Sequence, residues 1–170
     1  MTARCCLDCG ARLVTAVVEG RRRRHCPRCG WTFYANPVPA VAAVVVAGGR
    51  VLLARRARPP YAGAWDLPGG FLESDEPPLA GLRRELREEI GVGVRRASFI
   101  DFTTDRYGPR GFAVLALVYR VTPTSTRVHA KDDVSEARWV RPQDVALREI
   151  PFSGLRRLLR RYFRSTRARK

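Results

Sequence analysis

An acidic, helix-forming segment in the middle of the chain constrains its fold more than any other feature. Leucine and isoleucine recur at helical spacing from Leu79 to Ile90, which predicts one buried stripe of an amphipathic helix. Ser74 and Asp75 are candidate N-cap residues, and Gly91 is a candidate C-cap. The run of residues 68–70, Pro-Gly-Gly, predicts a tight turn. The segment is therefore expected to be a loop that leads into a helix.

Three carboxylates lie beside that apolar stripe. Glu85, Glu88 and Glu89 stand at positions i, i+3 and i+4, so on a helix they project from one arc of its surface. Like charges at this spacing repel each other, and Mg²⁺ would offset the repulsion because it prefers carboxylate oxygens and bridges them to phosphates. For the triple alone, a solvated acidic surface is the alternative. Glu76 and Arg84 are candidate partners that would lock the loop to the helix.

The whole segment matches the Nudix box, a pattern written G-x₅-E-x₇-R-E-U-x-E-E-x-G-U in which U is an aliphatic residue. The matching residues are Gly70, Glu76, Arg84, Glu85, Leu86, Glu88, Glu89, Gly91 and Val92. The chain therefore resembles a Nudix hydrolase, with softer likeness through residues 52–53, 63–70 and 136–140. The resemblance implies an α/β fold, an α/β/α sandwich with a mixed sheet, in which the box forms a loop, a helix and a second loop.

The resemblance also implies a role for each box residue. Glu85, Glu88 and Glu89 would hold Mg²⁺, or Mn²⁺ in its place, and would be the catalytic carboxylates. The Gly70 carbonyl would add another oxygen, and Glu73 corresponds to a carboxylate that joins the metal cluster in some relatives. The remaining pair orients the helix and consists of Glu76 and Arg84.

The general base and the substrate contacts are less sharply defined. Some relatives use a box glutamate as the base, and others use an acid from a downstream loop, for which the candidates here are Asp132, Asp133 and Glu136. A solvated loop before a strand is the alternative for these three. Arg55 and Tyr107 are candidate substrate-binding residues; for Tyr107 the alternative is a turn between two strands. Pro109 lies in the same region.

Two cysteine pairs predict a separate module at the N-terminus. Cys6 and Cys9 are separated by sixteen residues from Cys26 and Cys29, which is the spacing of a structural zinc site. Four thiolates close a tetrahedron around Zn²⁺ and leave no open position, so the ion would be structural. Disulfides are the alternative and are disfavoured in a cytosol. Cys5 is a spare thiol that could substitute for Cys6.

The chain is expected to contain a zinc ribbon over residues 1–35, a Nudix domain over 36–164 and a disordered basic tail over 165–170. In the ribbon, two short strands are predicted around Gly20. In the larger domain, strands are predicted at residues 38–46, 50–55, 112–121 and 137–141, and a last helix at about 153–163.

Charge and hydropathy limit the kinds of partner that this protein is expected to have. The net charge is +16, and much of it lies in residues 21–24 and 156–170. Solvated faces and a frayed tail are the favoured interpretation, with nucleic-acid binding as the alternative. No apolar run approaches the roughly 20 residues that span a bilayer, and the first six residues lack the apolar core of a signal peptide. A cytoplasmic enzyme without a membrane partner is expected, acting on a nucleotide, with a homodimer weakly favoured.

A zinc ribbon before a Nudix domain resembles NADH pyrophosphatases and zinc-ribbon proteins classed as ADP-ribose pyrophosphatases. The first group carries an S-Q-P-W-P-F-P-x-S motif after the box, which this sequence lacks; residues 101–110 stand in its place. ADP-ribose or a similar compound is therefore the expected substrate. The alternatives are NAD(H), nucleoside triphosphates, dinucleoside polyphosphates, an RNA cap, and a non-catalytic sensor that binds a nucleotide sugar.

Overall fold

A computed structural model describes residues 3–108 and 111–167 of the 170-residue chain. Contacts between Cα atoms divide the chain into two compact units, which meet between Pro37 and Val38. Among the described residues, no helix combines the length and apolar composition that crossing a membrane requires. Pro109 and Lys170 lie outside the described residues.

The first unit is a small antiparallel sheet. Its strands are β1 (Val14–Val18), β2 (Arg21–His25) and β3 (Thr32–Phe33), in the order β1-β2-β3. Gly20 turns the chain between β1 and β2 with a φ of 72°, a left-handed conformation that glycine adopts without a Cβ clash. The core of this unit is minimal and consists of Cys6, Leu13 and Cys26. So small a core needs an additional source of stability, such as a bound metal.

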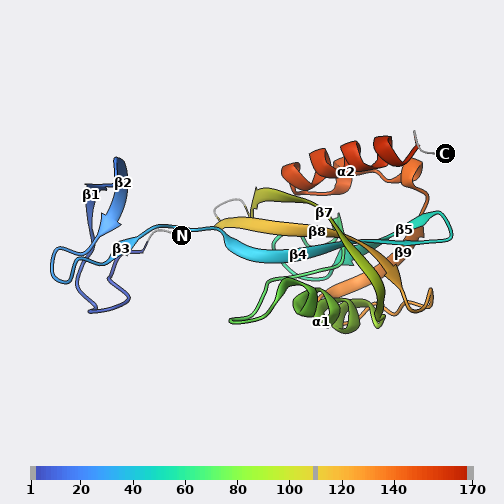
Figure 1. Ribbon diagram of the computed structural model, residues 1–170, viewed down its shortest axis with the longest axis horizontal. Helices are drawn as coiled ribbons and strands as arrows, with labels where there is room; N and C mark the ends of the chain where they lie inside the picture. Colours follow the sequence, from blue (N-terminus) through green and yellow to red (C-terminus); the bar gives the residue numbers. More distant parts are fainter. Residues whose placement is uncertain (1–2, 109–110, 168–170) are drawn as a thin grey trace. The chain divides into compact units, whose positions relative to one another are not determined.

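The second unit is a mixed sheet between two helices. The sheet has the order β6-β5-β4-β8-β7, and β9 also pairs with β5. The β4–β8 pair is parallel and the other pairs are antiparallel. The helices α1 and α2 lie on opposite sides of the sheet (Figure 1), which confirms the three-layer α/β/α architecture. The elements are β4 (Val38–Ala47), β5 (Arg50–Arg56), β6 (Trp65–Asp66), α1 (Pro78–Ile90), β7 (Val94–Arg106), β8 (Ala113–Pro123), β9 (Val134–Val140) and α2 (Ser153–Arg167), with short 3₁₀ turns at Pro142–Asp144 and Leu147–Glu149.

Strand β4 is apolar along its whole length because both of its faces are buried. Side chains alternate between the two faces of a strand, so Val44 packs in the cluster that includes Leu159 of α2. Its neighbours Ala43 and Val45 pack in the opposite cluster, with Leu86 of α1. Each helix thus covers one face of the same strand and is held against the sheet by apolar burial.

Helix α1 begins later than the capping pattern predicts. Its N-cap is Pro77, which makes no side-chain capping hydrogen bond, so neither Ser74 nor Asp75 caps the helix. Pro77 precedes Pro78 and is therefore held in an extended conformation, with ψ at 143°. The expected C-cap is confirmed, since Gly91 is left-handed and its N–H donates to the carbonyl of Arg87.

Helix α2 is longer than predicted. It continues to Arg167, so residues 165–167, which were expected to begin a disordered tail, are helical. Two side-chain hydroxyls bond to carbonyls three residues earlier, Ser165 to Tyr162 and Thr166 to Phe163. Phe163 is 7% exposed in the core, which anchors this last turn of the helix to the sheet. Residues 168–170 lie outside the described residues.

The start of α2 is held by a carboxylate from β7. Asp105 accepts hydrogen bonds from the backbone N–H groups of Gly154, at 2.8 Å, and Leu155, at 3.1 Å. These groups have no partner within the helix, and a carboxylate also interacts favourably with the positive end of the helix dipole. Asp105 therefore fixes α2 to the end of β7.

We predict that Asp105→Ala lowers the free energy of unfolding by about 1–2 kcal/mol, because it removes the cap from α2. The matched control is Asp101→Ala on the same strand, which breaks an exposed ion pair with Arg161 and should cost less than about 1 kcal/mol. Urea unfolding followed by circular dichroism measures both. Equal losses in the two variants would contradict the capping role.

Candidate functional site

Helix α1 presents its acidic residues to a cavity while its apolar stripe is buried. Glu89 is only 6% exposed, and one of its carboxylate oxygens accepts a hydrogen bond of 2.7 Å from the backbone N–H of Gly69. A Cβ atom at Gly70 would collide with the carboxylate of Glu85. Glycine at this position therefore lets the loop approach the helix closely enough to complete the cavity wall. Glu85, Glu88, Glu89 and Gly70 all line that cavity.

Arg84 connects the loop to the helix. Its Nε and one terminal nitrogen each donate a 2.9 Å hydrogen bond to Glu76, and the same terminal nitrogen donates to the carbonyl of Phe71 at 3.0 Å. The other terminal nitrogen contacts Glu85 at 2.8 Å and Glu88 at 3.1 Å. Hydrogen bonds from Arg84 lower the pKa of Glu76 to about 2. Glu76 and Arg84 thus hold the loop and the helix in a fixed orientation, and Arg84 also places a positive charge beside the acidic cluster.

The ionised forms of Glu85 and Glu89 are destabilised by their surroundings. Burial raises the pKa of Glu89 to about 9, and the nearby charges of Asp133 and Glu85 act in the same direction. Burial also raises the pKa of Glu85. A divalent cation would stabilise the ionised form of both groups, and a set of carboxylate and carbonyl oxygens suits Mg²⁺. The residues present therefore fit a hard divalent metal.

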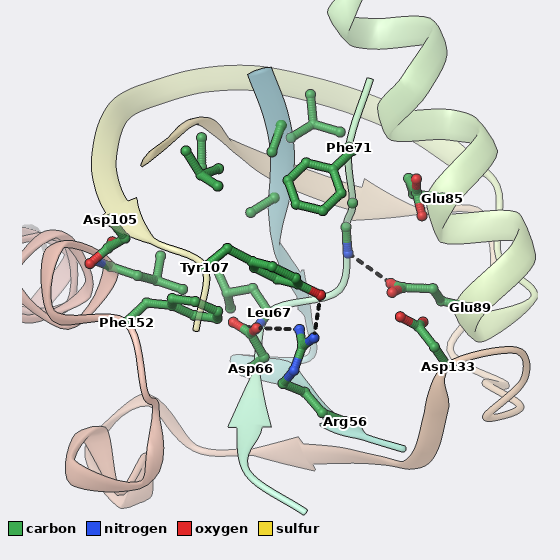
Figure 2. A pocket seen from close by; sticks show the side chains of 18 of the residues that line it. Arg56, Asp66, Leu67, Phe71, Glu85, Glu89, Asp105, Tyr107, Asp133 and Phe152 are labelled. Atoms are coloured by element: carbon green, nitrogen blue, oxygen red, sulfur yellow. Dashed lines mark hydrogen bonds and ion pairs between the residues drawn. The ribbon is translucent and has the colours of Figure 1, made fainter. Parts of the chain in front are cut away.

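Of the three downstream acids, two reach the cavity. Asp132 and Asp133 line it, and Figure 2 shows the carboxylate of Asp133 beside that of Glu89. The segment before them is docked on α1, because the N–H of Lys131 donates to the carbonyl of Glu89 at 2.9 Å. Glu136 does not line the cavity and instead bonds to Arg138 at 2.6 Å.

Arg56, and not Arg55, faces the cavity. Arg55 is bound to the carbonyl of Gly63 at 2.9 Å and to Glu136 at 3.5 Å, and it does not line the cavity. Arg56 does line it and donates a 2.7 Å hydrogen bond to the hydroxyl of Tyr107. Neighbouring residues of a strand point to opposite faces, so Arg55 lies away from the cavity, and its role in substrate binding stays a prediction. Every residue from Val51 to Ala54 is buried, so no alternation along the strand indicated which of the two arginines faces the cavity.

The end of the cavity away from the carboxylates is aromatic. Tyr107 packs against Phe71, with ring centroids 5.1 Å apart, and lies parallel to Phe152 at 6.2 Å (Figure 2). Asp66 lies beneath this group and pairs with Arg56 at 3.3 Å; burial raises the pKa of Asp66 to about 6. The cavity has a volume of about 330 Å³. It thus offers carboxylate oxygens that suit a metal at one end and aromatic rings at the other.

The first unit brings four cysteines together. Their four Sγ atoms all lie within 4.8 Å of one another, and they belong to Cys6, Cys9, Cys26 and Cys29. The two pairs sit in equivalent turns, in which Gly10 N–H donates to Cys6 and Gly30 N–H donates to Cys26, both at 3.0 Å. These cysteines are positioned to bind a metal such as zinc; Cys5 is outside the group.

Comparison with known proteins assigns the larger unit to a family. The family model of the NUDIX domain matches residues 36–162. A crystal structure of a NUDIX hydrolase from Nitrosomonas europaea superposes with a TM-score of 0.74 at 27% identity, over 95% of this chain and 91% of that one. A structural likeness over this much of both chains extends well beyond the box itself.

Two relatives are named for different substrates. One is a Mycobacterium tuberculosis protein provisionally named 8-oxo-dGTP diphosphatase 2, which is 40% identical over 54% of this chain and 65% of its own length. The other is an ADP-ribose pyrophosphatase from Methanocaldococcus jannaschii, 29% identical over 64% of each protein. The chain thus spans somewhat less than two thirds of the length of each relative.

We predict that the purified protein contains one zinc ion per chain, and that Cys26→Ser loses it, because three thiolates do not close the tetrahedral site. Cys5→Ser is the matched control and should retain the ion. Elemental analysis measures the zinc content, and proteolysis within residues 3–37 reports the folding of the first unit. Zinc loss in the Cys5 variant, or retention in the Cys26 variant, would contradict this ligand set.

Asp66 should make stability depend on pH. Its pKa is about 6 in the folded protein against an ordinary value of 3.8. A raised pKa stabilises the fold below about pH 3.8, and that contribution is lost as the pH rises through about 6. Compared with the wild type, Asp66→Asn should therefore lose less of its Tm between pH 4 and pH 7. If the Tm of both proteins changed with pH by the same amount, Asp66 would not be the source of this pH dependence.

Proposed function

Because this chain belongs to the Nudix hydrolase family, we propose that it uses Mg²⁺ to hydrolyse the pyrophosphate bond of a nucleoside diphosphate joined to a second group, with ADP-ribose as the favoured substrate. One observation carries the proposal. Four carboxylates, those of Glu85, Glu88, Glu89 and Asp133, gather at one end of a cavity whose other end is aromatic. Such a cavity suits a pyrophosphate at one end and a flat base at the other.

Four groups would hold the metal: the carboxylates of Glu85, Glu88 and Glu89 and the carbonyl of Gly70. Bound there, Mg²⁺ or Mn²⁺ would neutralise phosphate charge and lower the pKa of a bound water. Arg84 holds Glu85 and Glu88 in place through hydrogen bonds of 2.8 and 3.1 Å. This preorganisation spares the site a rearrangement when the substrate binds.

Asp133 is the favoured general base. It lies in the cavity beside Glu89 (Figure 2) and would accept the proton of the attacking water. The oxygen of that water bonds to one phosphorus, and the bridging P–O bond breaks, leaving the bridging oxygen on the other phosphate. ADP-ribose would give AMP and ribose 5-phosphate. Glu85, which also lines the cavity, is the alternative base, and Asp132 is a weaker candidate at its edge.

Arg56 and Tyr107 are the favoured substrate contacts. The guanidinium of Arg56 is largely buried and lies 5.3 Å from the centre of the Tyr107 ring, so a phosphate and a stacked base could bind side by side. The lack of the NADH pyrophosphatase motif and the relative named for ADP-ribose support ADP-ribose. The relative named for 8-oxo-dGTP keeps a nucleoside triphosphate as the second candidate. The intact set of box carboxylates argues against a non-catalytic sensor.

The test is a panel of ADP-ribose, NADH, NAD⁺, dinucleoside polyphosphates, a capped RNA and nucleoside triphosphates, each incubated with Mg²⁺. We expect ADP-ribose to give the highest kcat/KM. Glu88→Gln should lower kcat by at least about 100-fold, because it removes a metal ligand. Asp133→Asn should lower kcat about 100-fold or more with little change in KM, since general-base catalysis contributes about 10²–10⁴-fold.

The panel separates the rival functions. Preferred cleavage of a triphosphate or of NADH would retain the mechanism and overturn the substrate. Binding of ADP-ribose without turnover of any compound would favour the sensor. An unchanged kcat in Asp133→Asn would exclude Asp133 as the base and leave Glu85 as the candidate.

A further inference from the structure

The cavity offers little positive charge to an anionic substrate. Of the described residues that line it, only Arg56 and Arg84 are basic. Arg84 is committed to Glu76 and to two carboxylates of α1. Arg56 is therefore the arginine of this lining that could contact a phosphate at the aromatic end, and the direction of its guanidinium decides how well it does so.

Three acceptors hold the guanidinium of Arg56, and they come from three separate segments. Its Nε donates to the carbonyl of Pro60 at 2.9 Å, one terminal nitrogen donates to Asp66 at 3.3 Å, and the other donates to the hydroxyl of Tyr107 at 2.7 Å. Figure 2 shows the contacts with Asp66 and Tyr107 as dashed lines. A guanidinium has five N–H groups, so these contacts fix its direction and leave two N–H groups for a ligand.

Asp66 is the charged acceptor among the three, and it is itself held in place. It lies on β6, which pairs with β5. One of its carboxylate oxygens accepts the backbone N–H of Leu67 at 2.8 Å, and the other accepts Arg56. An amide has a single oxygen, so an asparagine here would turn its NH₂ group toward one of these two donors. A carboxylate is therefore the group that satisfies both.

The fold retains this carboxylate although burial opposes its charge. Asp66 is 8% exposed, and burial raises its pKa to about 6, although the charge of Arg56 acts in the opposite direction. Ionised Asp66 thus lowers the stability of the folded protein at neutral pH. A charged group that weakens the fold and lines a cavity is a candidate for a role in function.

The acidic end of the cavity would compete for Arg56 if Asp66 were absent. Glu85, Glu89 and Asp133 line the same cavity, and opposite charges attract more strongly in a partly buried site than in water. The two other acceptors of Arg56, a carbonyl and a hydroxyl, are neutral and supply no opposing charge. Asp66 is thus the group that keeps the positive charge at the aromatic end.

We propose that Asp66 is a positioning residue of the proposed reaction: its carboxylate holds the Arg56 guanidinium at the aromatic end of the cavity, where that group contacts the substrate phosphate nearest the stacked base. This inference rests on the proposed function, because it concerns the same cavity and substrate. Asp66 itself touches no reacting atom. Since Arg56 contacts this phosphate equally in the bound substrate and in the transition state, the pair affects substrate binding and not the chemical step.

The test is a double-mutant cycle on KM and kcat for ADP-ribose with Mg²⁺ at pH 8, formed by Asp66→Asn, Arg56→Gln and the two together. We expect Asp66→Asn to raise KM about tenfold, in keeping with the loss of a hydrogen bond to a charged group, and to change kcat less than twofold. Arg56→Gln should raise KM at least as much. The double variant should resemble Arg56→Gln alone, because Asp66 then has no group to position.

Three further variants separate direction from charge and from folding. Arg56→Lys keeps the charge but cannot make the three contacts, so KM should rise nearly as much as in Arg56→Gln. Asp66→Ser removes the charge without placing an NH₂ group against either donor, and it should behave like Asp66→Asn. The matched control is Asp144→Asn, which breaks an exposed ion pair with Arg141 outside the cavity and should change neither constant. Circular dichroism verifies that each variant is folded.

Several results would overturn the inference: an unchanged KM in both Asp66 variants, a fall in kcat as large as the rise in KM, a wild-type KM in Arg56→Lys, or additive effects in the double variant. Additive effects would mean that Asp66 acts independently of Arg56, as a purely structural role requires. Each of these results leaves the proposed function standing, provided that the wild type hydrolyses the substrate.

If another compound of the panel has the highest kcat/KM, that compound replaces ADP-ribose in the cycle. Failure of the wild type to hydrolyse every compound of the panel with Mg²⁺ would overturn the proposed function, and the inference about Asp66 with it.

Discussion

The larger unit depends on one guanidinium group. Arg84 uses its three nitrogens to hold Glu76 and the Phe71 carbonyl in the loop, and Glu85 and Glu88 on the helix. Without this group, a loop and a helix that both carry negative charge would repel each other across the cavity. Because the guanidinium is planar and donates in several directions, a lysine could not replace it. Apolar burial holds α1 against the sheet, and the contacts of Arg84 fix the loop against the acidic side of that helix.

The two ends of the cavity provide different chemical environments. At the helix end, several carboxylates lie close together, and burial raises the pKa of Glu89 to about 9. At the other end, Arg56 is held between Asp66 and Tyr107 and faces rings that a base could stack on. A cation at the first end would offset the repulsion among the carboxylates, and the rings at the second end offer a surface on which a base could stack. This combination is what carries the proposal of a metal-dependent pyrophosphate hydrolase.

Local sequence patterns predicted the elements whose formation depends on residues close together in the chain. The helix at residues 79–90 follows from its leucine spacing, β4 from its apolar run, and the cysteine cluster from the two paired turns. Strand β7 had no such signal, because it lies at the edge of the sheet and exposes Phe99 and Phe102. The choice of Arg56 over Arg55 depends on which way a strand faces, and the cap of α2 comes from Asp105, some 48 residues before the helix. Such long-range contacts leave no trace in a local pattern.

The parallel pairing of β4 with β8 also affects how the protein acquires its site. Residues 38–45 pair with residues 114–121, so the whole Nudix box lies inside the loop that this pairing closes. Closing a long loop costs chain entropy before its contacts offset that cost, and such non-local pairing slows folding. On a ribosome, α1 could form early, but the cavity wall that faces it would be missing until β8 had been synthesised. The carboxylates of α1 would thus be present long before the cavity that they line, and assembly of the site is a late event in the folding of the chain.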